Sequence, residues 1–229
     1  MSNVRDAPLD LMRGLAILMM IAFHFLYDLD SFGFIDAPLF SHWIPIAWRY
    51  LIVFLFLSAV GISLVLAHGK QLNSSKFVKR LMLLGLAALT VSFGTYIMFE
   101  NAWVYFGILH LIWVASIISI FFVKLPKVSL LLAAAILFGA IFDQPNLGFI
   151  VNIAQPYLPQ GSIDYYPLFP WLSFVLIGIY LGHHPFYRMA FTFRMHWLEV
   201  MGRHALIIYL THQVVLFGLV SFVYYLLNS

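Results

Sequence analysis

Four ionisable residues lie in one long apolar segment near the start of the chain: Asp10, Arg13, His24 and Asp28. At about 100° per residue in an α-helix, their spacing keeps all four within a stripe about 60° wide. Each ionisable side chain at the centre of a membrane helix costs roughly 2.5–3.5 kcal/mol on insertion scales, so an aligned set indicates a function or a polar pocket. The alternative is a set of contacts that only hold neighbouring helices together.

The types of these residues favour acid–base chemistry. An imidazole such as that of His24 exchanges protons near neutral pH, and Asp28, one helical turn further on, can orient the ring and stabilise its charged form. The pattern is typical of a general base held by a carboxylate. Arg13 can pair with Asp10, three residues earlier, or turn to an anionic ligand such as a phosphate.

The composition places these residues in a membrane. The chain has 229 residues, of which 63% are hydrophobic and 9% are charged, and its mean hydropathy is +0.97. A soluble domain carries about 25% charged residues, so we expect an integral membrane protein with the lipid bilayer as a partner. The net charge of +3 does not by itself predict a nucleic-acid partner, and we expect none. The absence of cysteine excludes disulfides, thiolate nucleophiles and cysteine-ligated metals, and we expect no metal site.

Seven apolar segments are predicted to cross the bilayer, which requires about 17–25 residues each. They are residues 9–29, 45–67, 77–99, 103–123, 128–142, 168–182 and 203–227. The predicted fold is therefore an all-α bundle of about seven transmembrane helices that forms a single domain, 1–229. The loop at 143–166 holds an apolar patch, 147–154, that is expected to lie on or re-enter the membrane, and the amphipathic segment 186–200 suits the membrane surface.

The distribution of charge predicts the orientation of the chain. Lysine and arginine follow the second, fourth and sixth segments, whereas the opposite connections carry only acids. By the positive-inside rule, the N-terminus is cytoplasmic and the C-terminus is outside. Arg49 is an exception near the outer end of the second segment. It is expected either to form a salt bridge with Asp28 or Asp30, or to contact a substrate anion.

The stretch DYYPLFPW (164–171) is a candidate substrate surface at the outer end of the sixth segment. It combines a carboxylate with aromatic rings, namely Asp164, Tyr165, Tyr166 and Trp171. Such a set is typical of a sugar-binding surface, but tyrosine and tryptophan also form the ordinary aromatic belt of membrane proteins. Both interpretations stay open.

Other polar or small residues in the spans are predicted to serve packing. Ser58 and Gly61 in the second segment would let a neighbouring helix approach closely or leave a passage for an elongated ligand, and Gly178 and Gly182 in the sixth also favour close packing. His110, a lone histidine in an apolar stretch, is expected to form a hydrogen bond in the core.

Several stretches resemble known acyltransferases. An arginine, ten intervening residues and a histidine on the first membrane helix, with an aspartate three residues before the arginine, resemble the signature of the type-three superfamily of membrane acyltransferases. The stretches LDLMRGLAILMMIAFHFLYDL, FLFLSAVGISL, FGILHLI, DYYPLFPWLSFVLIGIYLG and GRHALIIYLTHQ resemble, in this order, bacterial relatives of the heparan-α-glucosaminide N-acetyltransferase catalytic domain. Together they cover nearly the whole chain.

This resemblance implies an enzyme of the bacterial inner membrane. The enzyme would take an acyl group from cytosolic acetyl-CoA, a co-substrate, and deliver it to an amine or hydroxyl of a small-molecule or glycan acceptor near the outer face. Arg13 and His24 fall on the superfamily's arginine and histidine. The eukaryotic glucosaminide enzymes have asparagine where His24 stands, and their catalytic histidine lies in the next outer segment, where His42 is the nearest candidate. The implied base is therefore His24 or His42, with Asp28 orienting the imidazole.

The phosphates of CoA would bind cations on the cytoplasmic side. The candidates are Arg13, Lys79, Arg80 and Arg203. A proton-coupled transporter or channel using the same Asp/Arg/His stripe is the main alternative, although no inverted repeat is visible in the sequence. The oligomeric state is left open, with a homodimer as one alternative.

Overall fold

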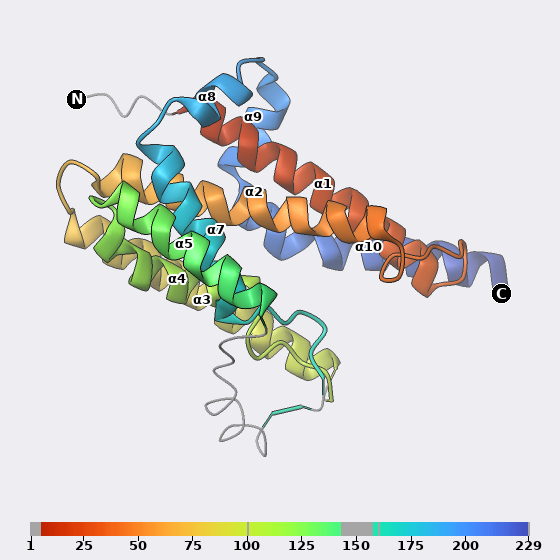
Figure 1. Cartoon of the computed structure of the whole chain (residues 1–229). Helices are drawn as coiled ribbons and strands as arrows, with labels where there is room; N and C mark the ends of the chain where they lie inside the picture. Colours follow the sequence, from red (N-terminus) through yellow and green to blue (C-terminus); the bar gives the residue numbers. More distant parts are fainter. Residues whose placement is uncertain (1–5, 100, 143–157, 160, 229) are drawn as a thin grey trace. The chain divides into compact units, whose positions relative to one another are not determined.

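We analysed a computed structural model of the chain, which describes residues 6–99, 101–142, 158–159 and 161–228 (Figure 1). Over these residues the secondary structure is entirely helical, which confirms the all-α prediction. In chain order the helices are α1 (Ala7–Ser31), α2 (Trp43–His68), α3 (Ser74–Met98), α4 (Ile108–Ser119), η1 (Ile120–Phe122), α5 (Pro126–Ile141), α7 (Leu168–Gly182), α8 (Phe186–Ala190), α9 (His196–Arg203) and α10 (Ala205–Asn228). The apolar patch predicted at 147–154 lies outside the described residues.

Four of these helices, α1, α2, α3 and α10, are long and apolar enough to cross a membrane. Three shorter apolar stretches, Ile108–Phe122, α5 and α7, coincide with the other predicted spans. At about 1.5 Å per residue, a helix of 15 or 16 residues is shorter than the hydrocarbon core of about 30 Å. The count of seven spans and the orientation of the termini therefore stay predictions.

Two predicted span boundaries differ from the helices. The fourth span was predicted from residue 103, but α4 begins at Ile108, where the carboxylate of Asp164 accepts a hydrogen bond from the Ile108 amide (3.1 Å). The last span was predicted from Arg203, but Arg203 ends α9, and α10 begins at Ala205.

The chain divides into two compact units. The first unit comprises Met1–Phe56 and Tyr187–Ser229, and the second comprises Leu57–Phe186, so α2 begins in one unit and ends in the other. Each unit is described by itself below. The single-domain organisation expected from the sequence stays a prediction.

In the first unit, α1 begins where the side chain of Asp6 accepts a hydrogen bond from the Leu9 amide (3.2 Å), an ordinary N-cap. The amphipathic segment predicted for the membrane surface forms α8 and α9, and α9 packs against the start of α1 (Figure 1). The backbones touch closely there, because a Cβ at Gly14 would overlap the carbonyl of Leu198 and a Cβ at Gly202 would overlap that of Asp10.

The core of the first unit holds α1 against the start of α2 and against α10. Ile17, Met20 and Phe23 of α1 form a buried cluster with Ile52 of α2. Side chains of α9 and α10, including Met201 and Tyr209, pack on its edge. This packing fixes the face of α1 that carries His24.

In the second unit, small residues let α2 and α7 lie in close contact. A Cβ at Gly61 would overlap the backbone of α7, and a Cβ at Gly178 would overlap the carbonyl of Ser58. The hydroxyl of Ser58 donates to the carbonyl of Phe174 (3.3 Å). The packing role predicted for these residues is confirmed.

Candidate functional site

A pair of histidines lies between α1 and α10 in the first unit. Nδ1 of His24 is 3.0 Å from the carbonyl oxygen of Met20, one turn earlier on α1. The same nitrogen is 3.3 Å from Nε2 of His212 on α10, and the two ring centroids are 4.9 Å apart. His212 is buried, with 9% of its surface exposed. We call His24 and His212 the histidine pair.

Asp28 and Gln213 lie next to the histidine pair and form an acid–amide pair. Nε2 of Gln213 donates to Oδ1 of Asp28 (2.8 Å), and only 1% of the Asp28 surface is exposed. The other two oxygens, Oδ2 of Asp28 and Oε1 of Gln213, are buried without a hydrogen-bond partner among the described residues. A buried acceptor without a partner is costly, so these two oxygens can accept hydrogen bonds from a bound molecule.

The expected hydrogen bond between Asp28 and His24 is therefore replaced by two others. Nδ1 of His24 bonds back to the preceding turn of its own helix, whereas Asp28 lies on the following turn and takes the amide of Gln213. Sequence reasoning missed His212 and Gln213 as members of the site. The available signal was their position, because they are adjacent polar residues inside the last apolar segment.

The beginning of α1 carries a network of ion pairs. Asp10, with 6% of its surface exposed, pairs with Arg13 (3.6 Å) and with Arg203 of α9 (3.5 Å). Glu199, with 2% exposed, pairs with Arg203 (3.3 Å) and with Arg194 (2.8 Å). Arg13 and Arg203 were predicted to hold CoA phosphates, and both have a carboxylate of the chain beside them.

A second ionic contact ties α8 to the start of α1. The hydroxyl of Tyr187 donates to Oδ2 of Asp6 (2.9 Å), and the guanidinium of Arg188 donates to the same oxygen from Nε (3.2 Å) and Nη2 (2.9 Å). Burial, together with the hydrogen bond to Asp6, raises the pKa of Tyr187 to about 12. The hydrogen bond to Asp6 also raises the pKa of Arg188.

His42 and Arg49, the other predicted residues of the first unit, make local contacts. His42 is exposed, and its Nδ1 accepts from the amide of Ile44 (3.4 Å). The guanidinium of Arg49 lies over the ring of Phe40, 5.6 Å from its centroid. The predicted salt bridge of Arg49 was wrong, because Asp28 is held by Gln213 and Asp30 accepts from the amide of Ala37 (2.8 Å).

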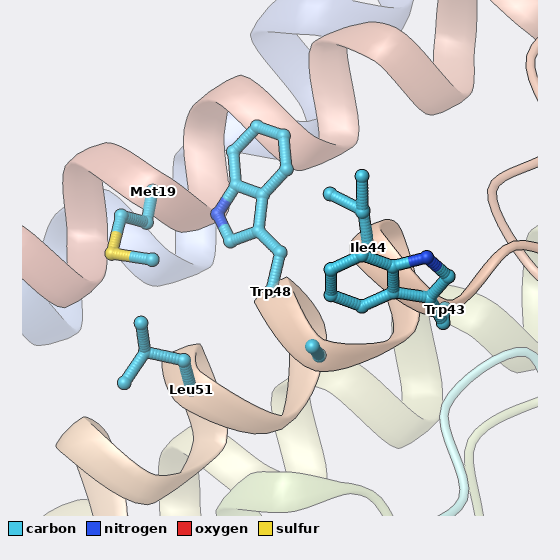
Figure 2. Close-up of a pocket in the computed structure, with 6 residues that line it drawn as sticks. Met19, Trp43, Ile44, Trp48 and Leu51 are labelled. Carbon is cyan, nitrogen blue, oxygen red and sulfur yellow. The ribbon is translucent and has the colours of Figure 1, made fainter.

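An apolar groove of about 510 Å³ lies between α1 and the start of α2. Met19 of α1 lines one side, and residues of the first turns of α2 line the other, namely Trp43, Ile44, Ala47, Trp48 and Leu51 (Figure 2). The indole nitrogen of Trp48 is buried without a hydrogen-bond partner among the described residues. The groove is open, because Trp43, Ile44 and Leu51 on its α2 side are exposed.

Lys79 and Arg80 lie on the first turns of α3, in the second unit. The side chain of Lys79 is exposed, and that of Arg80 is half-buried. Residues 57–99 contain no aspartate or glutamate. The charged residues of this stretch are therefore all cations, and they lie between positions 70 and 80.

The predicted substrate surface at 164–171 lies along the loop before α4. The amides of Ile163 and Tyr166 donate to the carbonyls of Ala102 and Phe106 (both 3.1 Å). The carboxylate of Asp164 caps α4, as described above. The aromatic rings are brought together in pairs: Tyr165 with Tyr105 (5.4 Å between centroids) and Tyr166 with Trp171 (5.2 Å).

His110 forms the hydrogen bonds that were predicted for a core histidine. Its Nδ1 accepts from the amide of Gly107 (3.2 Å), which places the proton of the neutral ring on Nε2. Nε2 in turn lies 3.2 Å from the hydroxyl of Ser92. His110 thus completes the turn before α4.

The described residues contain no group of three or more His, Cys, Asp or Glu side chains that could hold a metal ion.

In comparisons with known proteins, residues 5–214 match the family model described as heparan-α-glucosaminide N-acetyltransferase, catalytic. This range includes every residue of the histidine pair, the acid–amide pair and the groove. The searches of curated proteins and of solved structures found no match.

Proposed function

Because the chain belongs to the heparan-α-glucosaminide N-acetyltransferase catalytic family, and is thus a membrane acetyltransferase, we propose that it moves an acetyl group from acetyl-CoA to an amine or hydroxyl. The donor is cytosolic, and the acceptor is a sugar at the outer face of a bacterial inner membrane. The observation that carries this proposal is the orientation of His24. A carbonyl oxygen can only accept a hydrogen bond, so the contact with Met20 places a proton on Nδ1 of His24. In the neutral ring, Nε2 then carries the lone pair that a general base needs.

The reaction proceeds by direct transfer. As the acceptor's nitrogen or oxygen forms a bond to the thioester carbon, its proton moves to Nε2 of His24. The carbon–sulfur bond then breaks, and the departing thiolate of CoA takes this proton, which returns the histidine to its neutral form. General-base assistance of this kind contributes roughly 10²–10⁴ in rate, and positioning of the reactants supplies a further part.

The acid–amide pair supports a role in binding the acceptor. Oδ2 of Asp28 and Oε1 of Gln213 are both hydrogen-bond acceptors without partners. The N–H or O–H groups of an amine or a hydroxyl would satisfy these oxygens. Asp28 thus holds the nucleophile in this proposal, whereas the sequence had suggested that it orients the imidazole.

Two features support the binding of acetyl-CoA. The apolar groove lies between the first two helices, where the pantetheine arm is expected to run, and the indole N–H of Trp48 can donate to one of its amide carbonyls. The candidates for binding the phosphates are Arg13 and Arg203 in the first unit, and Lys79 and Arg80 in the second. Arg49 and the segment from Asp164 to Trp171 are proposed to contact the sugar, chiefly through Tyr165, Tyr166 and Trp171, since Asp164 caps a helix.

The test is acetyl transfer by purified protein in detergent, with glucosamine as the acceptor probe. Because the chain has no cysteine, a thiol-reactive dye reports the free CoA alone. We expect His24→Ala to reduce kcat by roughly 10²–10⁴ and His42→Ala to leave it within about twofold, because His42 is exposed and contacts only its own loop.

Two controls complete this experiment. Thermal unfolding verifies that both variants are folded, and N-acetylglucosamine, whose nitrogen is already acylated, separates N- from O-transfer. A folded His24→Ala protein with the wild-type rate would contradict the role of His24. A wild-type protein that releases no CoA with any sugar acceptor would contradict the proposed activity.

A further inference from the structure

The hydrogen bonds of the histidine pair determine which nitrogen of each ring carries the proton. Nδ1 of His212 is 2.7 Å from the carbonyl oxygen of Tyr209, and Nδ1 of His24 is 3.0 Å from that of Met20. Since a carbonyl oxygen only accepts, both Nδ1 atoms are protonated. In the neutral rings both Nε2 atoms are therefore unprotonated.

The hydrogen bond between the two rings then has only one direction, from His24 as donor to His212 as acceptor. Nε2 of His212 lies 3.3 Å from Nδ1 of His24, and it can only accept, so the N–H of His24 is shared between Met20 and His212. If Nε2 of His212 carried a proton while Nδ1 of His24 kept its own, two N–H donors would face each other. A proton on Nε2 of His24 leaves the contact intact and makes it a hydrogen bond from a charged donor, which is the stronger kind.

We propose that His212 is a positioning residue for His24: its Nε2 accepts the Nδ1–H of His24, so that Nε2 of His24 alone faces the acceptor and holds the transferred proton. This inference rests on the proposed function of His24 as the base. His212 takes the place that a carboxylate has in many catalytic triads, and the carboxylate of Asp28 is left for the substrate. Passing the Nδ1 proton on to His212 would leave Nδ1 of His24 with no proton to donate to the carbonyl of Met20, so the charge stays on His24 until the thiolate leaves.

Two substitutions of His212 separate this role from a structural one. The side-chain amide of His212→Asn lies near the position of Nδ1, so it can still donate to Tyr209 but cannot reach His24. The side-chain amide of His212→Gln lies near the position of Nε2, so its oxygen can still accept from His24. The two variants have similar polarity and differ chiefly in which of the two contacts they keep.

We expect His212→Asn to lower kcat by roughly 10- to 100-fold, the value of one hydrogen bond to a charged group, with KM for acetyl-CoA within about twofold. His212→Gln should regain most of that loss. The rate is measured as CoA release with glucosamine as the acceptor. Equal activity of the two variants, whether both high or both low, would overturn the inference.

A spectroscopic measurement tests the same inference without substrate and without any need for activity. The protein is labelled with ¹⁵N in its nine histidine rings, and the signals of His24 are identified by their loss in His24→Gln. We expect His24 as the Nδ1–H tautomer in the wild type and in His212→Gln, and a larger share of the Nε2–H tautomer in His212→Asn, where Met20 is the one acceptor left for the Nδ1–H. A His24 ring protonated on Nε2 in the wild type would overturn the inference.

The two experiments fail in different ways. If the wild type transfers no acetyl group to a sugar, the proposed function is contradicted, yet the tautomer of His24 still decides the hydrogen-bond direction. If transfer occurs and depends on His24, but the tautomer is the opposite one, the proposed function stands and the role of His212 is refuted.

Discussion

The two units of this protein differ in what surrounds their cations. In the first unit, the arginines at the start of α1, in α8, in α9 and in the connection between α8 and α9 pair with carboxylates. The pairs are Arg13 with Asp10, Arg188 with Asp6, Arg194 with Glu199, and Arg203 with both Asp10 and Glu199. In the second unit, residues 57–99 contain three lysines and one arginine but no acid.

This difference separates two uses of positive charge. Buried acids such as Asp10 and Glu199 are tolerated because charged partners compensate them, so the ion pairs of the first unit fix α8 and α9 to α1. In the second unit, residues 57–99 contain no carboxylate, and Lys79 and Arg80 are the residues of this stretch that we propose for binding the phosphates of CoA. The positive-inside pattern alone does not make this distinction, because it counts all cations equally.

The strongest way to break the contact between α9 and α1 is to add a methyl group at Gly202. In Gly202→Ala the new Cβ would overlap the backbone carbonyl of Asp10, so the helices must separate. We expect a loss of stability of about 1–3 kcal/mol, the usual cost of overpacking, measured as the thermal unfolding midpoint in detergent. Gly94→Ala in α3 of the second unit is the matched control, because nothing lies near its Cβ. If both variants unfold at the wild-type temperature, the close packing of α9 is wrong.

The second-largest effect on stability is expected from the ion pairs of α9. Glu199→Gln keeps the shape of the side chain but removes the charge that faces two arginines. We expect a loss of about 1–2 kcal/mol in the free energy of unfolding, limited because the Arg194 side chain is 73% exposed and water can replace its partner. Lys79→Gln in the second unit should change stability by less than about 0.5 kcal/mol. A comparable loss in both variants would remove the contrast between the units.

The cations of the second unit should instead affect the binding of the donor substrate, acetyl-CoA. In the double variant Lys79→Gln, Arg80→Gln, we expect KM for acetyl-CoA to rise roughly tenfold, the value of one good phosphate contact, with kcat unchanged. Arg194→Gln in the first unit is the control, and its KM should stay at the wild-type value. The reverse result, an effect of Arg194 alone, would place the phosphates on the first unit.

The contact of Tyr187 with Asp6 predicts a small dependence of stability on pH. The pKa of Tyr187 is about 12 in the folded protein and 10.0 in the reference state, so folding favours the protonated phenol. Its contribution is complete below about pH 10 and is lost as the pH rises towards 12. We expect Tyr187→Phe to lose about 1 kcal/mol at neutral pH and to show a shallower decline in unfolding temperature above pH 10 than the wild type. Parallel declines would contradict the contact.

The sequence predicted the helices better than the contacts between them. Each of the seven apolar segments coincides with an apolar helix, because hydropathy depends on local composition alone. The stripe on α1 placed His24 and Asp28 on one face, but periodicity could not tell which partner each would take. His212 and Gln213 are nearly two hundred residues away in the sequence, and only the packing of α10 on α1 brings them to the site.

Arg49 shows the same limit. Charge sorting suggested an aspartate partner, because the sequence predicted both acids and Arg49 near the outer side of the membrane. The loop before α2 places Phe40 under the guanidinium instead, and the two aspartates are used by Gln213 and by the amide of Ala37. Long polar side chains have many partners within reach, and the sequence does not rank them.

The most direct test of the central claim is an electron cryo-microscopy map of the protein with acetyl-CoA bound. If Nε2 of His24 is the base, the pantetheine arm should follow the groove beside Trp48, and the thioester carbon should lie so that an acceptor atom about 3–3.5 Å from it also contacts Nε2 of His24. The account would be contradicted if the thioester lay beside His42 and the ligand could not reach the histidine pair.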